Sequence, residues 1–197
     1  MSKPGAKIFD VDKVIPLIEA RWPAMSKKQV YLAATEQFFD QVNDAIRQKQ
    51  HFTLETNFRD YQLAEIVAGF KRNGYTTNMV YLTLENIEQS ISRVNERVLD
   101  GGHFVDVKNI QQNYDQGLQY LERFADQFDN LRIYDASKGP GELISLFKVK
   151  QQHLVYLNAD LPARVEQTVS NIANRYQNNS RSQDNDEEQE WDQGLGR

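Results

Sequence analysis

Residues 51–60 read HFTLETNFRD, an apolar run that ends abruptly in polar side chains. Phe52, Thr53 and Leu54 have the composition of a short strand inside a sheet. Glu55 follows at a position that such a pattern would keep buried, and Thr56, Asn57 and Arg59 come after it. A carboxylate at the end of a buried strand needs hydrogen-bonding partners. Two roles therefore stay open for Glu55, a structural hydrogen bond or the binding of a ligand.

Helix and strand patterns alternate on both sides of this stretch. Residues S-K-K-Q at 26–29 match a capping box, which predicts a helix that begins there and ends near Lys49. We expect further helices at about 11–20, 60–72, 86–99, 107–128 and 161–176. We expect strands at 7–9, 51–55, 76–83 and 131–134, and a β-hairpin at 143–157.

This order predicts an α/β fold. Strands that alternate with helices need crossover connections, so we expect a mostly parallel sheet flanked by helices, followed by the C-terminal hairpin and helix. The continuous apolar run at 79–82 is typical of a strand covered on both faces. We expect one domain over residues 1–176. Residues 177–197 hold six acids and two arginines without a periodic apolar face, which predicts an acidic, disordered tail.

Polar residues follow three of the expected strands. Asp10 and Asp12 follow the first, residues 55–57 the second, and Asp135 and Ser137 a later one. Ligands bind at the carboxyl ends of the strands in open α/β sheets. This edge of the sheet is therefore the expected functional edge.

The carboxylate of Asp12 has two possible roles. It has the chemistry of a general base that takes a proton from a hydroxyl group. Asp10 or Asp12 is alternatively only the N-cap of the helix that follows, and spacing alone favours the cap.

Arg93 and Arg97 lie four residues apart in the predicted helix 86–99, so they share one helical face. Two guanidinium groups so placed can hold phosphate oxygens. The alternative is a solvated face whose charge Glu96 neutralises. His103 follows Gly101 and Gly102 and either touches a ligand from this loop or serves as a cap or surface residue.

Composition excludes several classes of function. The 197 residues include no cysteine, so no disulfide scaffold, thiolate metal site or cysteine nucleophile is present. The three histidines lack metal-ligand spacing, and we expect no metal site. The net charge of −5 and the absence of a basic stripe argue against nucleic acid as the main ligand. We expect no membrane span and a cytoplasmic location.

The sequence contains a single G-x-x-x-x-G, at 69–74. It lacks the Lys and Ser/Thr of a phosphate loop, and it closes a helix instead of opening one.

Taken in order, seven segments between Lys7 and Ser137 resemble the zeta-toxin-like P-loop kinases. The segments are KIFDVDKV, ETNFR, KRNGY, NMVYLTL, RVNERVLDGGH, NIQQNYDQGL and YDAS. Each is unspecific alone, and the ordered set carries the resemblance. It departs from the family before Tyr114, where Gln111, Gln112 and Asn113 stand in place of an arginine cluster.

The resemblance implies a P-loop kinase-like fold and ATP-dependent phosphoryl transfer with Mg²⁺. In the best-known members the acceptor is the sugar hydroxyl of UDP-N-acetylglucosamine, and an antitoxin protein restrains the enzyme. By position, Asp12 matches the base for the acceptor hydroxyl. Residues 55–57, with Arg59, match the acceptor-binding strand end. Arg93 and Arg97 match the arginines that steady the transferring phosphate.

The family's first strand, phosphate loop and first helix precede the segment that matches Lys7. We expect this chain to lack them, as an N-terminally shortened form that is inactive as a kinase. The other possibility is a non-catalytic pseudokinase or regulatory binding protein that keeps the acceptor pocket, with the 143–157 hairpin filling the sheet.

Overall fold

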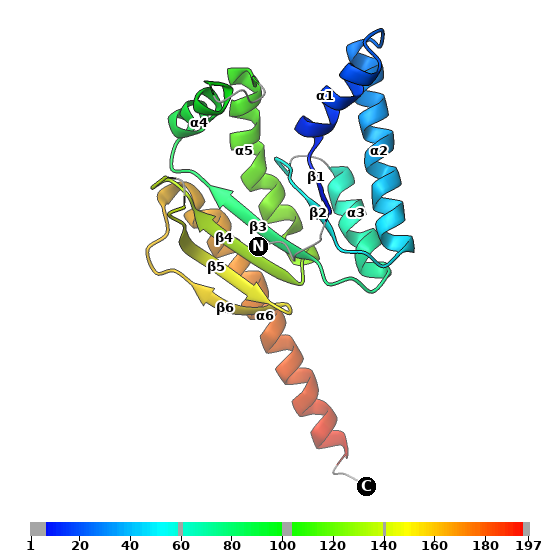
Figure 1. Ribbon diagram of the computed structural model, residues 1–197. Coiled ribbons are helices and arrows are strands. Elements are labelled where there is room, and N and C mark those ends of the chain that lie inside the picture. The colour runs from blue at the N-terminus through cyan, green and yellow to red at the C-terminus, as the bar shows by residue number, and fades with distance from the viewer. Residues whose placement is uncertain (1–6, 59–60, 100–103, 140, 195–197) are drawn as a thin grey trace. The chain divides into compact units, whose positions relative to one another are not determined.

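The computed structural model describes residues 7–58, 61–99, 104–139 and 141–194. Side chains are described as far as Asn178, apart from those of Lys7, Ile8 and Asp12. Along the chain lie six α-helices, one 3₁₀ turn and six strands within these residues (Figure 1). The chain divides into two compact units, unit 1 over Met1–Asn57 and unit 2 over Phe58–Arg197.

Unit 1 is a pair of parallel strands with two helices. Strand β1 (Lys7–Phe9) pairs with β2 (Phe52–Leu54), with Phe9 opposite Leu54. Helices α1 (Val11–Arg21) and α2 (Lys27–Arg47) lie between them in sequence. The ring of Phe38 on α2 packs at 4.9 Å from Phe9 and 6.1 Å from Phe52, which ties α2 to both strands.

The predicted capping box is present at the start of α2. The backbone N–H of Gln29 donates to Ser26 Oγ at 3.4 Å, and the backbone N–H of Ser26 donates to Gln29 Oε1 at 2.9 Å. The helix then buries Val30, Ala34 and Val42 at helical spacing.

Unit 2 contains a four-stranded sheet in the order β3-β4-β5-β6. The strands are β3 (Asn78–Thr83), β4 (Asn130–Asp135), β5 (Ile144–Lys150) and β6 (His153–Leu157). β3 and β4 are parallel, whereas β4-β5 and β5-β6 are antiparallel. The α/β class is confirmed, but the prediction of a mostly parallel sheet is wrong for this sheet, because the hairpin β5-β6 adds two antiparallel pairings.

The hairpin extends the sheet beside β4. β5 pairs with β4 over Ile144–Lys150, and within the described residues neither hairpin strand pairs with β1, β2 or β3. The alternative in which residues 143–157 replace a missing strand next to these three is therefore wrong.

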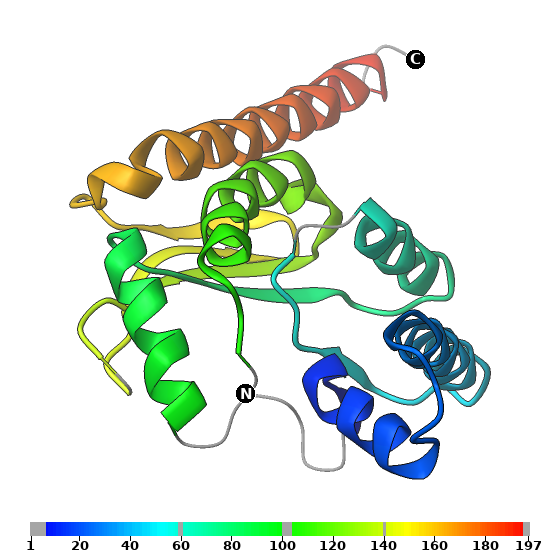
Figure 2. The ribbon, with the colours of Figure 1, turned by 90° about the horizontal axis from the view of Figure 1, so that it is seen from above.

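Unit 2 contains four α-helices within the described residues. They are α3 (Tyr61–Arg72), α4 (Ile87–Leu99), α5 (Val107–Phe124) with its 3₁₀ turn η1 (Ala125–Gln127), and α6 (Ala163–Gly194). Both α5 and α6 lie on one face of the sheet (Figures 1 and 2). The core there joins Leu121 of α5 and Ile172 of α6 to Leu131, Ile133 and Phe147 of the strands, each with no measurable exposure.

Two further expectations differ from the structure. β3 is covered on one face only, since Val80 and Leu82 are 54% and 53% exposed. Helix α6 continues to Gly194, past the predicted end near Tyr176. The disorder expected for residues 177–197 stays a prediction.

Candidate functional site

The strands of unit 1 end at a common polar edge. Because β1 and β2 are parallel and in register, Asp10 and Glu55 directly follow paired residues. The backbone N–H of Glu55 also donates to Phe9 O at 3.2 Å, one residue beyond the last strand pair, Phe9 and Leu54. The expectation that both acidic segments leave the same edge is confirmed for these two strands.

The start of α1 separates the roles of Asp10 and Asp12. The backbone N–H groups of Lys13 and Val14 donate to Asp10 O at 3.1 Å, so Asp10 stands at the position before the helix. Its carboxylate forms an ion pair with Lys13 at 3.1 Å. Asp12 lies one residue inside α1 and is not the cap residue. Its side chain lies outside the described part, so its role as a base stays a prediction.

Glu55 is exposed, as are Thr56 and Asn57. β2 is only three residues long and its side chains are half-buried, so the chain emerges into solvent immediately after Leu54. A buried structural role for the Glu55 carboxylate is therefore wrong. The carboxylate, hydroxyl and amide of residues 55–57 instead form a short, solvent-facing run of hydrogen-bonding groups.

Arg93 and Arg97 lie on α4 in unit 2, but their environments differ. Arg93 is half-buried, and its Nη2 donates to the carbonyl oxygen of Ala136, just past the end of β4. Arg97 is exposed. Glu96 accepts a hydrogen bond from Ser92 Oγ at 3.1 Å. Arg93 thus holds α4 against the carboxyl end of β4, the edge at which a ligand of a parallel pair binds.

A hydrogen-bonded network joins the ends of β3 and β4. Ser137 Oγ donates to Asp135 Oδ1 at 2.5 Å and accepts from the backbone N–H of Glu85 at 2.7 Å. Tyr114 Oη on α5 donates to Glu85 O at 3.0 Å. The loops after the two strands are therefore fixed to each other and to α5.

Arg164, at the start of α6, completes this network and was not expected from the sequence. Its guanidinium lies 3.1 Å from the centre of the Tyr114 ring, and its Nη2 donates to Tyr114 O. Burial raises the pKa of the Tyr114 hydroxyl, against the opposing effect of Arg164. Fifty positions separate the two residues, and no local sequence motif predicts a contact between them.

The predicted site residues fall into separate groups. Asp12 and residues 55–57 belong to unit 1, whereas Arg93 and Arg97 belong to unit 2. Arg59 and His103 lie outside the described residues, and so do Gly101 and Gly102.

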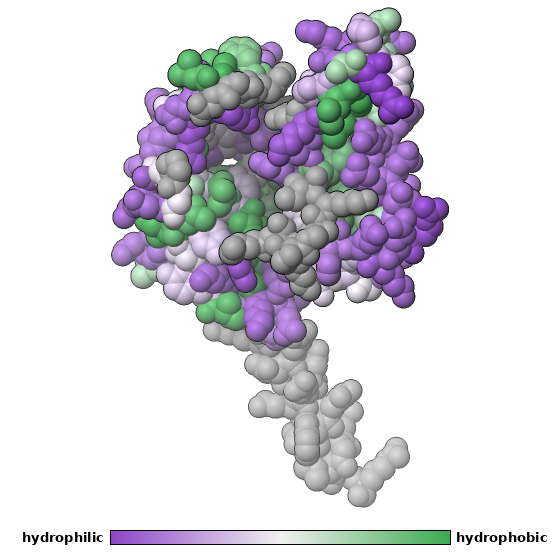
Figure 3. All heavy atoms as spheres, in the orientation of Figure 1, coloured by the Kyte–Doolittle hydropathy of each residue, from purple (hydrophilic) through white to green (hydrophobic). Residues whose placement is uncertain are grey.

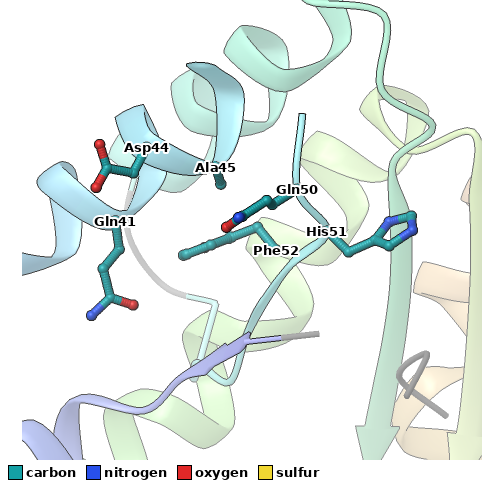
Figure 4. Close-up of a pocket in the computed structure, with 6 residues that line it drawn as sticks. All are labelled: Gln41, Asp44, Ala45, Gln50, His51 and Phe52. Atoms are coloured by element: carbon teal, nitrogen blue, oxygen red, sulfur yellow. The ribbon is translucent and has the colours of Figure 1, made fainter. Parts of the chain in front are cut away.

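A shallow pocket in unit 1 lies at the other end of β2. Figure 4 shows it between Gln41, Asp44 and Ala45 of α2 and the segment 50–52. Its volume of about 30 Å³ suits a water molecule or two and not a nucleotide sugar. None of the predicted site residues lines it.

The residues present match only part of an ATP·Mg²⁺ site. Two guanidinium groups on α4 have the chemistry to bind phosphate oxygens. The sequence contains no G-x-x-x-x-G-K-[ST] segment. Among the described residues no cluster of three His, Asp or Glu side chains is placed to hold a metal ion. These residues do not fit a complete triphosphate site, and no transfer step follows from their geometry.

The comparisons with known proteins add no assignment. No family model, curated protein or solved structure matches this chain. No helix in the described ranges has the length and apolar character of a membrane span.

Proposed function

We propose that this chain carries the acceptor-binding part of a zeta-toxin-like small-molecule phosphotransferase, and that it binds a nucleotide sugar such as UDP-N-acetylglucosamine. The observation that carries the proposal is the polar edge of unit 1. There the parallel strands β1 and β2 end together, and Glu55 stands exposed with Thr56 and Asn57 beside it.

Each group has a role in this proposal. Glu55, Thr56 and Asn57 bind hydroxyl and amide groups of the sugar, and Arg59 and His103 add contacts. Asp12 takes the proton of the acceptor hydroxyl in the complete enzyme. Arg93 and Arg97 stabilise the negative charge of the phosphoryl group, ATP with Mg²⁺ being the donor. The proposal includes a cytoplasmic location and an antitoxin as protein partner.

The assignment of a P-loop kinase-like fold is part of the same proposal. In a P-loop kinase-like fold the phosphate loop follows a strand inside the sheet. Within the described residues β2 pairs only with β1, and β3 only with β4, so each has one unpaired edge. A P-loop kinase-like fold would pair such edges with a further strand.

A second candidate is a non-catalytic binding or regulatory protein. The observation that favours it is the lack of a phosphate-loop motif in the sequence. In that case the polar edge of unit 1 binds its ligand, and no phosphoryl group is transferred.

Paired calorimetric titrations test the proposal. The chain is titrated with UDP-N-acetylglucosamine, with UDP alone and with ATP·Mg²⁺. We expect the nucleotide sugar to bind with a Kd below about 1 mM, more tightly than UDP. Tight binding of ATP·Mg²⁺ with turnover would favour the enzyme over the second candidate. Absence of nucleotide-sugar binding at about 1 mM would contradict the acceptor site.

A further inference from the structure

One face of the four-stranded sheet is left uncovered by α5 and α6. Side chains alternate between the faces of a strand. Met79 and Tyr81 pack into the core with the helices, so Val80 and Leu82 point to the opposite side. We call this side the open face.

Strand register identifies the other residues of the open face. Three rows cross the sheet: Asn78, Asn130, Lys150 and His153; Val80, Arg132, Lys148 and Tyr156; and Leu82, Tyr134 and Ser145. No carboxylate occupies any of these paired positions. The rows contain three cations, Arg132, Lys148 and Lys150.

The open face is both apolar and basic. Val80 and Leu82 are more than half exposed, and Tyr156 is 41% exposed. The Lys148 ammonium lies 5.3 Å from the centre of the Tyr156 ring. Figure 3 shows apolar and polar residues interspersed over this sheet. Exposed apolar side chains on neighbouring strands favour an interaction surface, and the three cations, which have no carboxylate at the paired positions of the open face, favour an acidic occupant.

The chain itself contains an acidic segment of this kind. Residues 184–192 read DNDEEQEWD, with six carboxylates, no cation and one tryptophan. They belong to the C-terminal end of α6, which is helical to Gly194 and continues past the sheet (Figure 1).

As part of the continuous helix α6, the segment does not reach the open face of its own copy. The first turns of α6, from Val165 to Tyr176, pack against the opposite face of the sheet. From Tyr176 to Asp192 a continuous helix advances about 24 Å without turning back. We propose that the acidic end of α6 in one copy binds the open face of a second copy, so that the protein self-associates through charge complementarity.

This inference is independent of the proposed function, and sedimentation analysis of the full-length chain tests it. We expect a dimer whose Kd rises about tenfold or more between about 50 mM and 500 mM NaCl, because salt screens exposed charges. Arg132→Glu should weaken the dimer by about tenfold or more, because it reverses the central cation of the open face. Arg72→Glu, the same reversal on an exposed residue of α3, is the matched control and should change Kd by less than about twofold.

A charge exchange provides the second measurement. Glu187→Lys with Glu188→Lys should also weaken self-association, by about tenfold or more. A mixture of this variant with Arg132→Glu should form a heterodimer, since both sides of one contact are then reversed. Circular dichroism checks that each variant is folded. A monomer at about 100 μM in low salt would overturn the inference, and so would a dimer that Arg132→Glu leaves intact and that salt does not weaken.

Discussion

Glu55 lies where the backbone of β2 leaves its sheet, with its carboxylate in solvent. An exposed acid can usually be changed at little cost in stability. A substitution of Glu55 can therefore change ligand binding without a large change in the stability of the fold.

Glu55→Gln should weaken the binding of UDP-N-acetylglucosamine by about tenfold, since hydrogen bonds to a charged group contribute more than those to a neutral amide. The free energy of unfolding should change by less than about 0.5 kcal/mol. Calorimetry and urea unfolding measure the two quantities. Glu36→Gln, an exposed glutamate of α2 in the same unit, is the control and should affect neither. An equal loss of binding in both variants would remove Glu55 from the site.

Tyr176 is a residue whose role is structural. Its hydroxyl donates to Ala125 O at 2.9 Å in the core of unit 2, and its side chain is 1% exposed. Tyr176→Phe should lower the free energy of unfolding by about 1 kcal/mol, because the buried Ala125 carbonyl loses one of its two donors and keeps only the backbone N–H of Phe128. Tyr31→Phe, at an exposed position of α2, should leave it unchanged. Equal unfolding midpoints of wild type and Tyr176→Phe would contradict this role.

Asp129, the residue before β4, connects two other elements: it contacts Thr77, the residue before β3, and Lys71 of α3. Its Oδ2 accepts from the backbone N–H of Thr77 at 2.7 Å and from Thr77 Oγ1 at 2.9 Å, and Lys71 Nζ lies 2.9 Å from Oδ1. Burial opposes ionisation of this carboxyl, but the bonds from Lys71 and Thr77 outweigh it and lower the Asp129 pKa below its ordinary value.

Asp129→Asn should therefore destabilise the protein by about 1–2 kcal/mol at pH 7. A lowered pKa gives stability that is present above the ordinary pKa of an aspartate and is lost as the pH falls. The difference between wild type and variant should shrink toward pH 3 in urea unfolding. Asp44→Asn, which breaks an exposed ion pair with Arg47, is the control. A difference that grows on acidification would contradict the assignment.

Elements that depend on local chemistry could be predicted from the sequence. The S-K-K-Q capping box fixes the start of α2 through two hydrogen bonds three residues apart, and the hairpin depends on neighbouring strands. The partition into two sheets and the Tyr114–Arg164 contact could not be predicted, because they join residues far apart in the sequence. The exposure of Glu55 was missed for a related reason, since burial depends on what packs over β2.

The whole molecule consists of two units with different amounts of core. In unit 2 Tyr176 is buried and Tyr81 is partly buried against the same core, and desolvation raises the pKa of each hydroxyl to about 12. The folded state keeps these protons at a pH where the unfolded chain, with an ordinary tyrosine pKa near 10, releases them.

Stability should therefore be constant up to about pH 10 and fall between about pH 10 and 12, because the folded state binds more protons there. The urea midpoint of unit 2 at successive pH values measures this slope. Tyr176→Phe should make the slope shallower by removing one of the two groups. A midpoint that rises over this range would contradict the burial of the two hydroxyls.

Hydrogen exchange with and without UDP-N-acetylglucosamine is a direct measurement of whether the polar edge of unit 1 binds a nucleotide sugar. Backbone amides of the first turn of α1 and of residues 55–57 should exchange more slowly in the presence of the ligand. The β5-β6 hairpin of unit 2 should be unchanged and serves as the internal control. Unchanged exchange at residues 55–57 with the ligand in excess, or protection confined to the hairpin, would contradict binding of the nucleotide sugar at the polar edge.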